Sequence, residues 1–179
     1  RLVPSVYAHG GEPIKSDEII VINPLTDKII KRIEIAPNLH LAHVVIAPDN
    51  KYAYVTAQQG GIIYKINADT FEIEKKIMLK SGSEPHGLRI TPDGSFAYIA
   101  MLKSKSLNIL NLKNDEIVEV PLEGAAVQTG ITPDGKFIVV SLYDTKQLAI
   151  YHKETNSVTY VDLPQNSKGP IQMYPTPDS

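Results

Sequence analysis

Short runs of β-branched and aromatic residues, separated by turn signals, recur along all 179 residues of the chain. Ile, Val, Tyr and Thr dominate the runs, and clusters of Asn, Asp, Pro and Gly interrupt them about every 8–12 residues, as in all-β proteins. No window of about 11 residues combines a helical apolar period with capping residues. The pattern therefore predicts an all-β fold.

A Pro-Asp turn element divides this pattern into units. Four tetrads carry it, namely Ala47-Pro48-Asp49-Asn50, Thr91-Pro92-Asp93-Gly94, Thr132-Pro133-Asp134-Gly135 and Thr176-Pro177-Asp178-Ser179. Their prolines lie 44, 41 and 44 residues apart, and a four-stranded propeller blade occupies about 40–45 residues. Proline presets φ at the second turn position and glycine accepts a positive φ, so the chain reverses direction between two strands.

Each unit repeats the same order of strands, labelled A to D from the centre of a propeller outward. Strand A precedes the tetrad, at 44–46, 88–90, 129–131 and 171–174. An aromatic-led strand B follows the first three tetrads, at 52–56, 96–100 and 137–141. A C–D hairpin appears four times, at 19–35, 62–79, 107–122 and 148–163. We therefore predict a β-propeller domain of four-stranded antiparallel blades, three complete and one split, with repeats at 1–38, 39–82, 83–123, 124–166 and 167–179.

The split blade permits three arrangements. The last A strand (171–174) would pair with a first B strand (3–8) to close a four-bladed ring, or the chain would be an arc of a 7–8-bladed ring that continues after Ser179. The arc is the favoured interpretation, because a final turn signal with no strand behind it leaves a sheet edge open. Two copies would also complete an eight-bladed ring as a homodimer.

The turn and strand B together resemble the repeat of YVTN-family β-propellers. Thr91-Pro92-Asp93-Gly94 precedes Phe96-Ala97-Tyr98-Ile99-Ala100, and Pro48-Asp49 precedes Tyr52-Ala53-Tyr54-Val55-Thr56. The resemblance covers nearly the whole chain, although Asn50 replaces the turn glycine and no copy has the full Tyr-Val-Thr-Asn. It implies an extracytoplasmic location, and ligand binding on the face formed by the D–A and B–C loops.

Composition narrows the range of partners. The formal net charge of −2 gives no reason to expect nucleic acid. No apolar run approaches the roughly 18 residues needed for a membrane-spanning helix, so membrane insertion is not expected. The chain has no cysteine, which excludes disulfides and thiolate chemistry.

Histidines on the predicted loop face are the candidate metal ligands. His9, His43 and His86 map to this face, and imidazole is a common ligand of copper, zinc and iron. His86-Gly87-Leu88 before a Pro-Asp-Gly turn is similar to a histidine-bearing repeat of nitrous-oxide-reductase propellers, and cytochrome cd1-type propellers hold haem over this face. The alternative is that these histidines hydrogen-bond the backbone of a neighbouring blade. Aligned on the prolines, His43 and His86 stand five and six residues ahead, which places them on opposite sides of the pleat.

Polar residues of strand A are candidates for lining the channel. Gln128 and Gln172 stand five residues before their prolines, as His43 and Gly87 do, and would form a polar ring for a ligand or for water. Arg89 is a charge in a mostly apolar strand A. It would either clamp an anion or bridge carbonyl groups between blades.

Catalytic motifs are missing from the sequence. It contains no Gly-x-Ser-x-Gly, phosphate-binding loop or dinucleotide glycine pattern. We therefore predict a non-catalytic binding or scaffold module for a protein or small ligand. The alternative is a metal- or haem-dependent propeller using copper, zinc or haem iron. A lactonase-like hydrolase is less favoured, because Asp17, Glu84 and Asp144 lie in separate loops.

Overall fold

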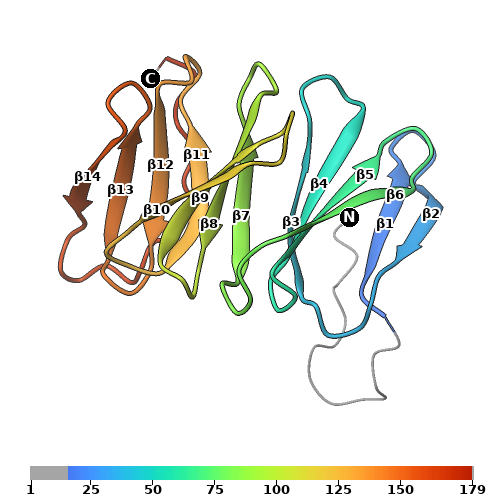
Figure 1. The fold of residues 1–179 in the computed structure, drawn as a ribbon, viewed down its shortest axis with the longest axis horizontal. Coiled ribbons are helices and arrows are strands. Elements are labelled where there is room, and N and C mark those ends of the chain that lie inside the picture. The colour runs from blue at the N-terminus through green and yellow to red at the C-terminus, as the bar shows by residue number, and fades with distance from the viewer. Residues whose placement is uncertain (1–15, 179) are drawn as a thin grey trace. The chain divides into compact units, whose positions relative to one another are not determined.

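The computed structural model describes residues 16–178, and in that range it contains fourteen β-strands and no helix (Figure 1). No helix of the described chain is therefore long and apolar enough to cross a membrane. The chain divides into two compact units between Leu39 and His40, next to the predicted boundary between the first two repeats. The all-β prediction is confirmed.

The first unit contains the earliest predicted C–D hairpin. Strands β1 (Glu18–Asn23) and β2 (Lys28–Glu34) pair antiparallel. Asn23 shapes the turn, because its side-chain oxygen accepts the backbone N–H of Leu25 at 2.9 Å. The predicted B strand at 3–8 lies outside the described residues.

The second unit consists of three four-stranded antiparallel sheets, each in chain order. The first contains β3 (Leu41–Ile46), β4 (Tyr52–Ala57), β5 (Ile62–Asn67) and β6 (Ile73–Met78). The second contains β7 (Pro85–Ile90), β8 (Phe96–Met101), β9 (Ser106–Asn111) and β10 (Ile117–Pro121). The third contains β11 (Ala126–Ile131), β12 (Phe137–Leu142), β13 (Gln147–His152) and β14 (Ser157–Asp162). The three complete blades of the sequence prediction are thus confirmed.

The Pro-Asp tetrads form the turns between the first and second strands. In each, the last residue donates its N–H to the carbonyl of the first, at 2.8 Å for Asn50, 2.9 Å for Gly94 and 2.8 Å for Gly135. All three donors have positive φ, of 59°, 72° and 70°. Asparagine tolerates this left-handed conformation better than other non-glycine residues, which explains how Asn50 replaces the glycine.

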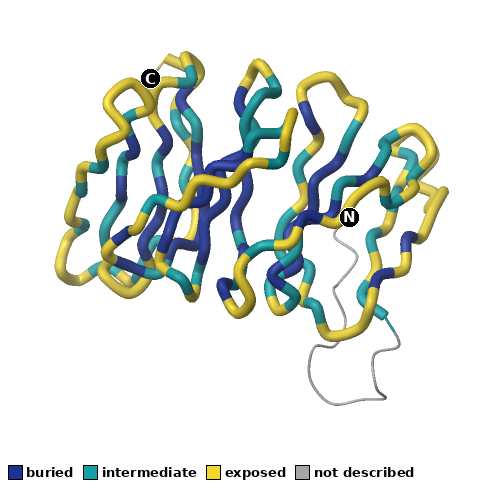
Figure 2. Tube along the Cα trace, viewed as in Figure 1, coloured by how far each residue is buried: buried dark blue, intermediate teal, exposed yellow. Residues whose placement is uncertain are grey.

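The core lies between adjacent sheets. Tyr54 and Ile63 of the first sheet pack with Leu110 of the second, and Tyr98 of the second packs with Val140 of the third. Figure 2 shows the buried segments concentrated in the second and third strands of the three sheets and in β7 and β11, with the outermost strands and the turns mostly exposed. Each sheet of the second unit therefore depends on a neighbouring sheet for burial of its apolar face.

The inner strands β3, β7 and β11 lie side by side. Each has a β-bulge near its start, between Leu41 and His43, between Pro85 and Leu88, and between Ala126 and Thr129. A bulge inserts an extra residue and so offsets the alternation of side chains along the strand.

The predicted final A strand is not a strand in the structure. A strand needs a partner strand that bonds to it through the backbone. No described strand pairs in this way with residues 171–174. The segment nevertheless lies against the third sheet, since Ser141 Oγ donates to the Ile171 carbonyl at 3.3 Å. A Cβ on Gly130 would lie 2.9 Å from Pro175 Cδ, so the proline ring packs directly against the backbone of β11.

Truncation of the core between sheets should destabilise the second unit. Leu110 is fully buried, so we expect Leu110→Ala to lower the free energy of unfolding by about 2–5 kcal/mol. Leu25→Ala is the control, because Leu25 is 93% exposed in the β1–β2 turn and should change stability by less than about 0.5 kcal/mol. Urea unfolding would measure both. Equal effects would contradict the packing described here.

Candidate functional site

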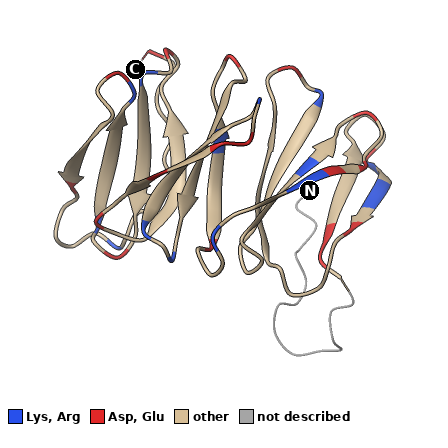
Figure 3. Cartoon of the chain, in the orientation of Figure 1, with Lys and Arg blue, Asp and Glu red and all other residues tan. Residues whose placement is uncertain are grey.

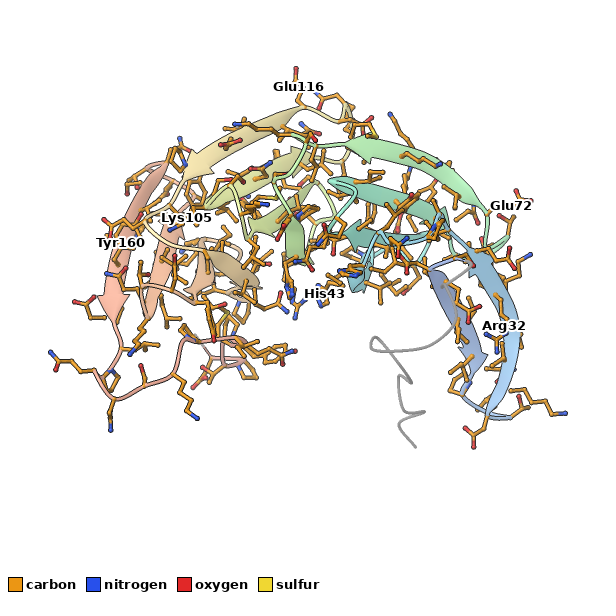
Figure 4. All side chains as sticks on the ribbon, turned by 90° about the horizontal axis from the view of Figure 1, so that it is seen from below. Arg32, His43, Glu72, Lys105, Glu116 and Tyr160 are labelled. Atoms are coloured by element: carbon orange, nitrogen blue, oxygen red, sulfur yellow. The ribbon has the colours of Figure 1, made fainter. Side chains whose placement is uncertain are left out.

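Polar side chains of the inner strands β3 and β7 lie close together. His43 of β3 and Arg89 and His86 of β7 are the central members. Figure 4 shows His43 at the inner edge of the sheets, whereas Glu116 and Tyr160 lie on the outer side. Charges of the second unit lie mostly at the turns and on outer strands (Figure 3), so an arginine on an inner strand is unusual in this fold.

The ring of His43 is shared between two donors. The backbone N–H of Leu88 lies 3.0 Å from Nδ1, and Arg89 Nη1 lies 3.0 Å from Nε2. A neutral imidazole has one acceptor nitrogen and one N–H, so in either tautomer one of these two contacts sets a donor against a donor. Burial, the Arg89 charge and His86 lower the pKa of His43, in that order of size. The site is therefore rich in hydrogen-bond donors and poor in acceptors.

Arg89 has no carboxylate partner among the described residues. Its Nη1 donates to the Leu88 carbonyl at 2.9 Å, which is within its own strand, and its guanidinium carbon lies 5.5 Å from the centre of the Tyr174 ring. His43, Arg89 and Tyr174 come from three different repeats. A half-buried guanidinium without an anionic partner is electrostatically uncompensated.

His86 connects the sheets through its backbone and its ring. Its carbonyl accepts a hydrogen bond from Thr56 Oγ1 at 2.7 Å, and its Nδ1 lies 2.9 Å from the Val127 carbonyl. Because a carbonyl only accepts, Nδ1 carries the hydrogen. Both histidine rings face the following sheet, which corrects the prediction of opposite sides. The bulges offset the side-chain alternation on which that prediction relied.

These contacts bear on the predicted copper, zinc or haem site. Both ring nitrogens of His43 face donors, and His86 has only Nε2 left for a ligand. Glu84 is held by Lys103 at 3.6 Å and by Gln58 at 3.3 Å. No group of three or more His, Cys, Asp or Glu able to hold a metal occurs in the described part of the chain. The described residues alone do not form a ligand set, and His9 lies outside them, so the metal site stays a prediction.

The predicted polar ring of the channel is not present as such. Gln128 is 4% exposed, and its Oε1 accepts the N–H of Thr129 at 3.1 Å. It is packed against Gly87, where a Cβ would lie only 2.1 Å from Gln128 Oε1. The Gln128 side chain therefore packs between β7 and β11, because Gly87 has no side chain to occupy that space. Gln172 is exposed.

Two residues missed by the sequence reasoning connect neighbouring repeats. Thr56 and Ser141 occupy the same position, eight residues after their prolines. Each accepts the N–H of its own inner strand, from His43 at 3.1 Å and Gln128 at 3.0 Å, and each donates to the next repeat. A hydroxyl at this position was visible in the aligned repeats, but its partners were not.

No family model matches the chain, and no curated protein sequence is significantly similar to it. Solved structures do match. Virginiamycin B lyase from Staphylococcus aureus has a TM-score of 0.78 at 18% identity, over 89% of this chain and 53% of that one. The fold is that of a β-propeller.

Two further matches come from other proteins of this fold. Hydrazine synthase from Kuenenia stuttgartiensis has a TM-score of 0.67 at 18% identity, over 74% of this chain and 38% of that one. A putative 6-phosphogluconolactonase from Bacteroides uniformis has a TM-score of 0.65 at 20% identity, over 81% and 47%. This chain thus spans about half, or less, of the structures it matches, and likeness at this identity shows the fold alone.

The lowered pKa of His43 predicts a pH dependence. The unfolded chain takes up a proton at this residue near pH 6.5, but the folded chain does so only at lower pH. The stability that neutral His43 contributes is therefore present above the unfolded pKa and is lost as pH falls below it. NMR titration should place the His43 midpoint below 6.5, and Arg89→Leu should raise it. A midpoint unchanged by Arg89→Leu would contradict the role of that charge.

Proposed function

We propose that this chain is a ligand-binding part of a β-propeller, and that Arg89 and His43 hold a small anion at the inner ends of its blades. The observation that carries the proposal is the half-buried Arg89 guanidinium, which has no carboxylate partner among the described residues. An anion would supply the negative charge that this position lacks.

The chemistry of the two side chains suits an oxyanion. A guanidinium presents several N–H donors in a planar fork that matches carboxylate and phosphate oxygens. Neutral His43 with its hydrogen on Nε2 would add a donor at the point nearest Arg89, 3.0 Å away. An acceptor beside both groups would relieve the contact between donors. The Tyr174 ring, which is itself exposed, lies over one side of the guanidinium, with its centre 5.5 Å from the guanidinium carbon.

The fold itself leaves the function class open. Structures similar to this chain include a lyase, hydrazine synthase and a putative lactonase. One is a catalytically inactive virginiamycin B lyase variant solved with quinupristin, so a related propeller binds a small molecule. Binding without catalysis is our proposal here, since a guanidinium and an imidazole suit the recognition of an anion. We also propose an extracytoplasmic location, which the resemblance to YVTN-family propellers implies, and a homodimer that completes the ring.

Isothermal titration at pH 7 with inorganic phosphate and with acetate would test the anion site. We expect saturable binding of at least one of these anions, weakened at least about tenfold by Arg89→Leu, because a charge-assisted pair is lost. Arg32→Leu is the matched control, since Arg32 already pairs with Glu18 at 2.6 Å and should not contribute.

Thermal unfolding of each variant would confirm that it is folded. Failure of the folded wild-type chain to bind either anion would overturn the proposal, as would equal binding by Arg89→Leu. Zinc binding that His86→Ala abolishes and Arg89→Leu leaves intact would instead favour the metal-dependent alternative.

A further inference from the structure

A cavity of about 280 Å³ lies between the first two sheets of the second unit, beside their Pro-Asp turns. These turns end the inner strands, and neither His43 nor Arg89 lines the cavity. Pro48 and Leu112 provide apolar surface, Tyr52 and Tyr54 provide aromatic rings, and the two turns contribute Asp49 and Asp93. Its volume is just below the range of about 300–1,000 Å³ usual for drug-sized ligands, so a smaller molecule would fit.

Tyr54 contributes a hydroxyl group to the wall of this cavity. The residue is 3% exposed, and its hydroxyl makes no hydrogen bond to any described residue. Burial, followed by the charge of Asp115, raises the pKa of Tyr54 to about 12, so the hydroxyl stays protonated and can donate. The hydroxyl lies on the wall of the cavity and bonds no described residue, so it is available to donate to a ligand group there.

Charges of both signs surround the cavity. Hydrogen bonds from Ser95 and Thr91 lower the pKa of Asp93 to about 2, so its carboxylate is ionised. From the described part of the chain, Asp49 accepts only the backbone N–H of Lys51, at 3.0 Å. The Lys113 ammonium forms no ion pair with a described residue. Lys65, unlike Lys113, already has an anionic partner, because its ammonium group pairs with Glu74 at 2.8 Å. The same ammonium group lies 3.7 Å from the centre of the Tyr52 ring.

The next junction between sheets shows why space remains at this one. Tyr98 repeats Tyr54, and there the ring of Tyr151 packs 6.2 Å from it. In the first junction the residue corresponding to Tyr151 is the smaller Leu110. Leu112 likewise stands where the next repeat has Lys153, whose Nζ lies 5.7 Å from the Phe96 ring centre. The repeat is therefore modified at the residues that would otherwise occupy this volume.

We propose that this cavity binds a small zwitterion with an apolar body, of the chemical class of a free amino acid. The ammonium group would face Asp49 and Asp93, and the carboxylate would face Lys113 and the Tyr54 hydroxyl. The apolar body would lie against Tyr52, Pro48 and Leu112. This site is independent of the anion site, because the two share no residue.

Isothermal titration with L-phenylalanine, phenethylamine and 3-phenylpropionate separates the two charges of the ligand. We expect L-phenylalanine to bind and each singly charged probe to bind at least about fivefold more weakly, because each lacks one charged contact. Tyr54→Phe should weaken L-phenylalanine binding about fivefold through loss of one hydrogen bond. Tyr98→Phe is the matched control and should bind as the wild type does, since its hydroxyl lies at the junction that Tyr151 fills.

Lys113→Ala identifies the carboxylate contact. It should weaken L-phenylalanine binding but leave the binding of phenethylamine unchanged, because phenethylamine has no carboxylate. Tyr54→Phe and Lys113→Ala should both retain the wild-type melting temperature within a few degrees. Absence of saturable L-phenylalanine binding by the folded wild-type chain would overturn the proposal, and so would unchanged affinity in both Tyr54→Phe and Lys113→Ala. Loss of phosphate binding in Arg89→Leu with L-phenylalanine binding retained would confirm that the two sites are separate.

Discussion

The second unit depends on the burial of one sheet against the next. Each sheet places apolar side chains on its faces, and only a neighbouring sheet can cover them. Leu110, Ile63 and Val140 are fully buried in this way. Burial of apolar area is the main favourable term in folding, so the spacing between sheets is set by these side chains. The backbone and side chains of the inner strands must therefore fit the spacing between sheets that this packing imposes.

At the inner edge that distance brings backbones very close together. Gly87 can approach Gln128 only because it has no Cβ, and Thr56 uses one hydroxyl to connect the backbones of β3 and β7. The same closeness brings His43 and Arg89 together from different repeats. The candidate anion site is thus a consequence of sheet packing and not of any local sequence motif.

Departures from the repeat create both candidate sites. An inner strand that is otherwise mostly apolar contains Arg89, and the junction that contains Leu110 lacks the ring that Tyr151 supplies one repeat later. A repeat scaffold can tolerate such changes because each blade contacts only its neighbours. Both candidate sites therefore lie where equivalent positions of the repeats differ.

The sequence by itself determined the strands, their order and the turns, because these depend on contacts within a few residues. Three Pro-Asp tetrads reverse the chain, each with a positive φ at its last residue, Asn50, Gly94 or Gly135. The tertiary structure alone decided which way His43 and His86 face, that Gln128 is buried, and that residues 171–174 lie against the third sheet without pairing. Each of these depends on a bulge or on a contact with another repeat, about 30 to 45 residues away, which a local pattern does not specify.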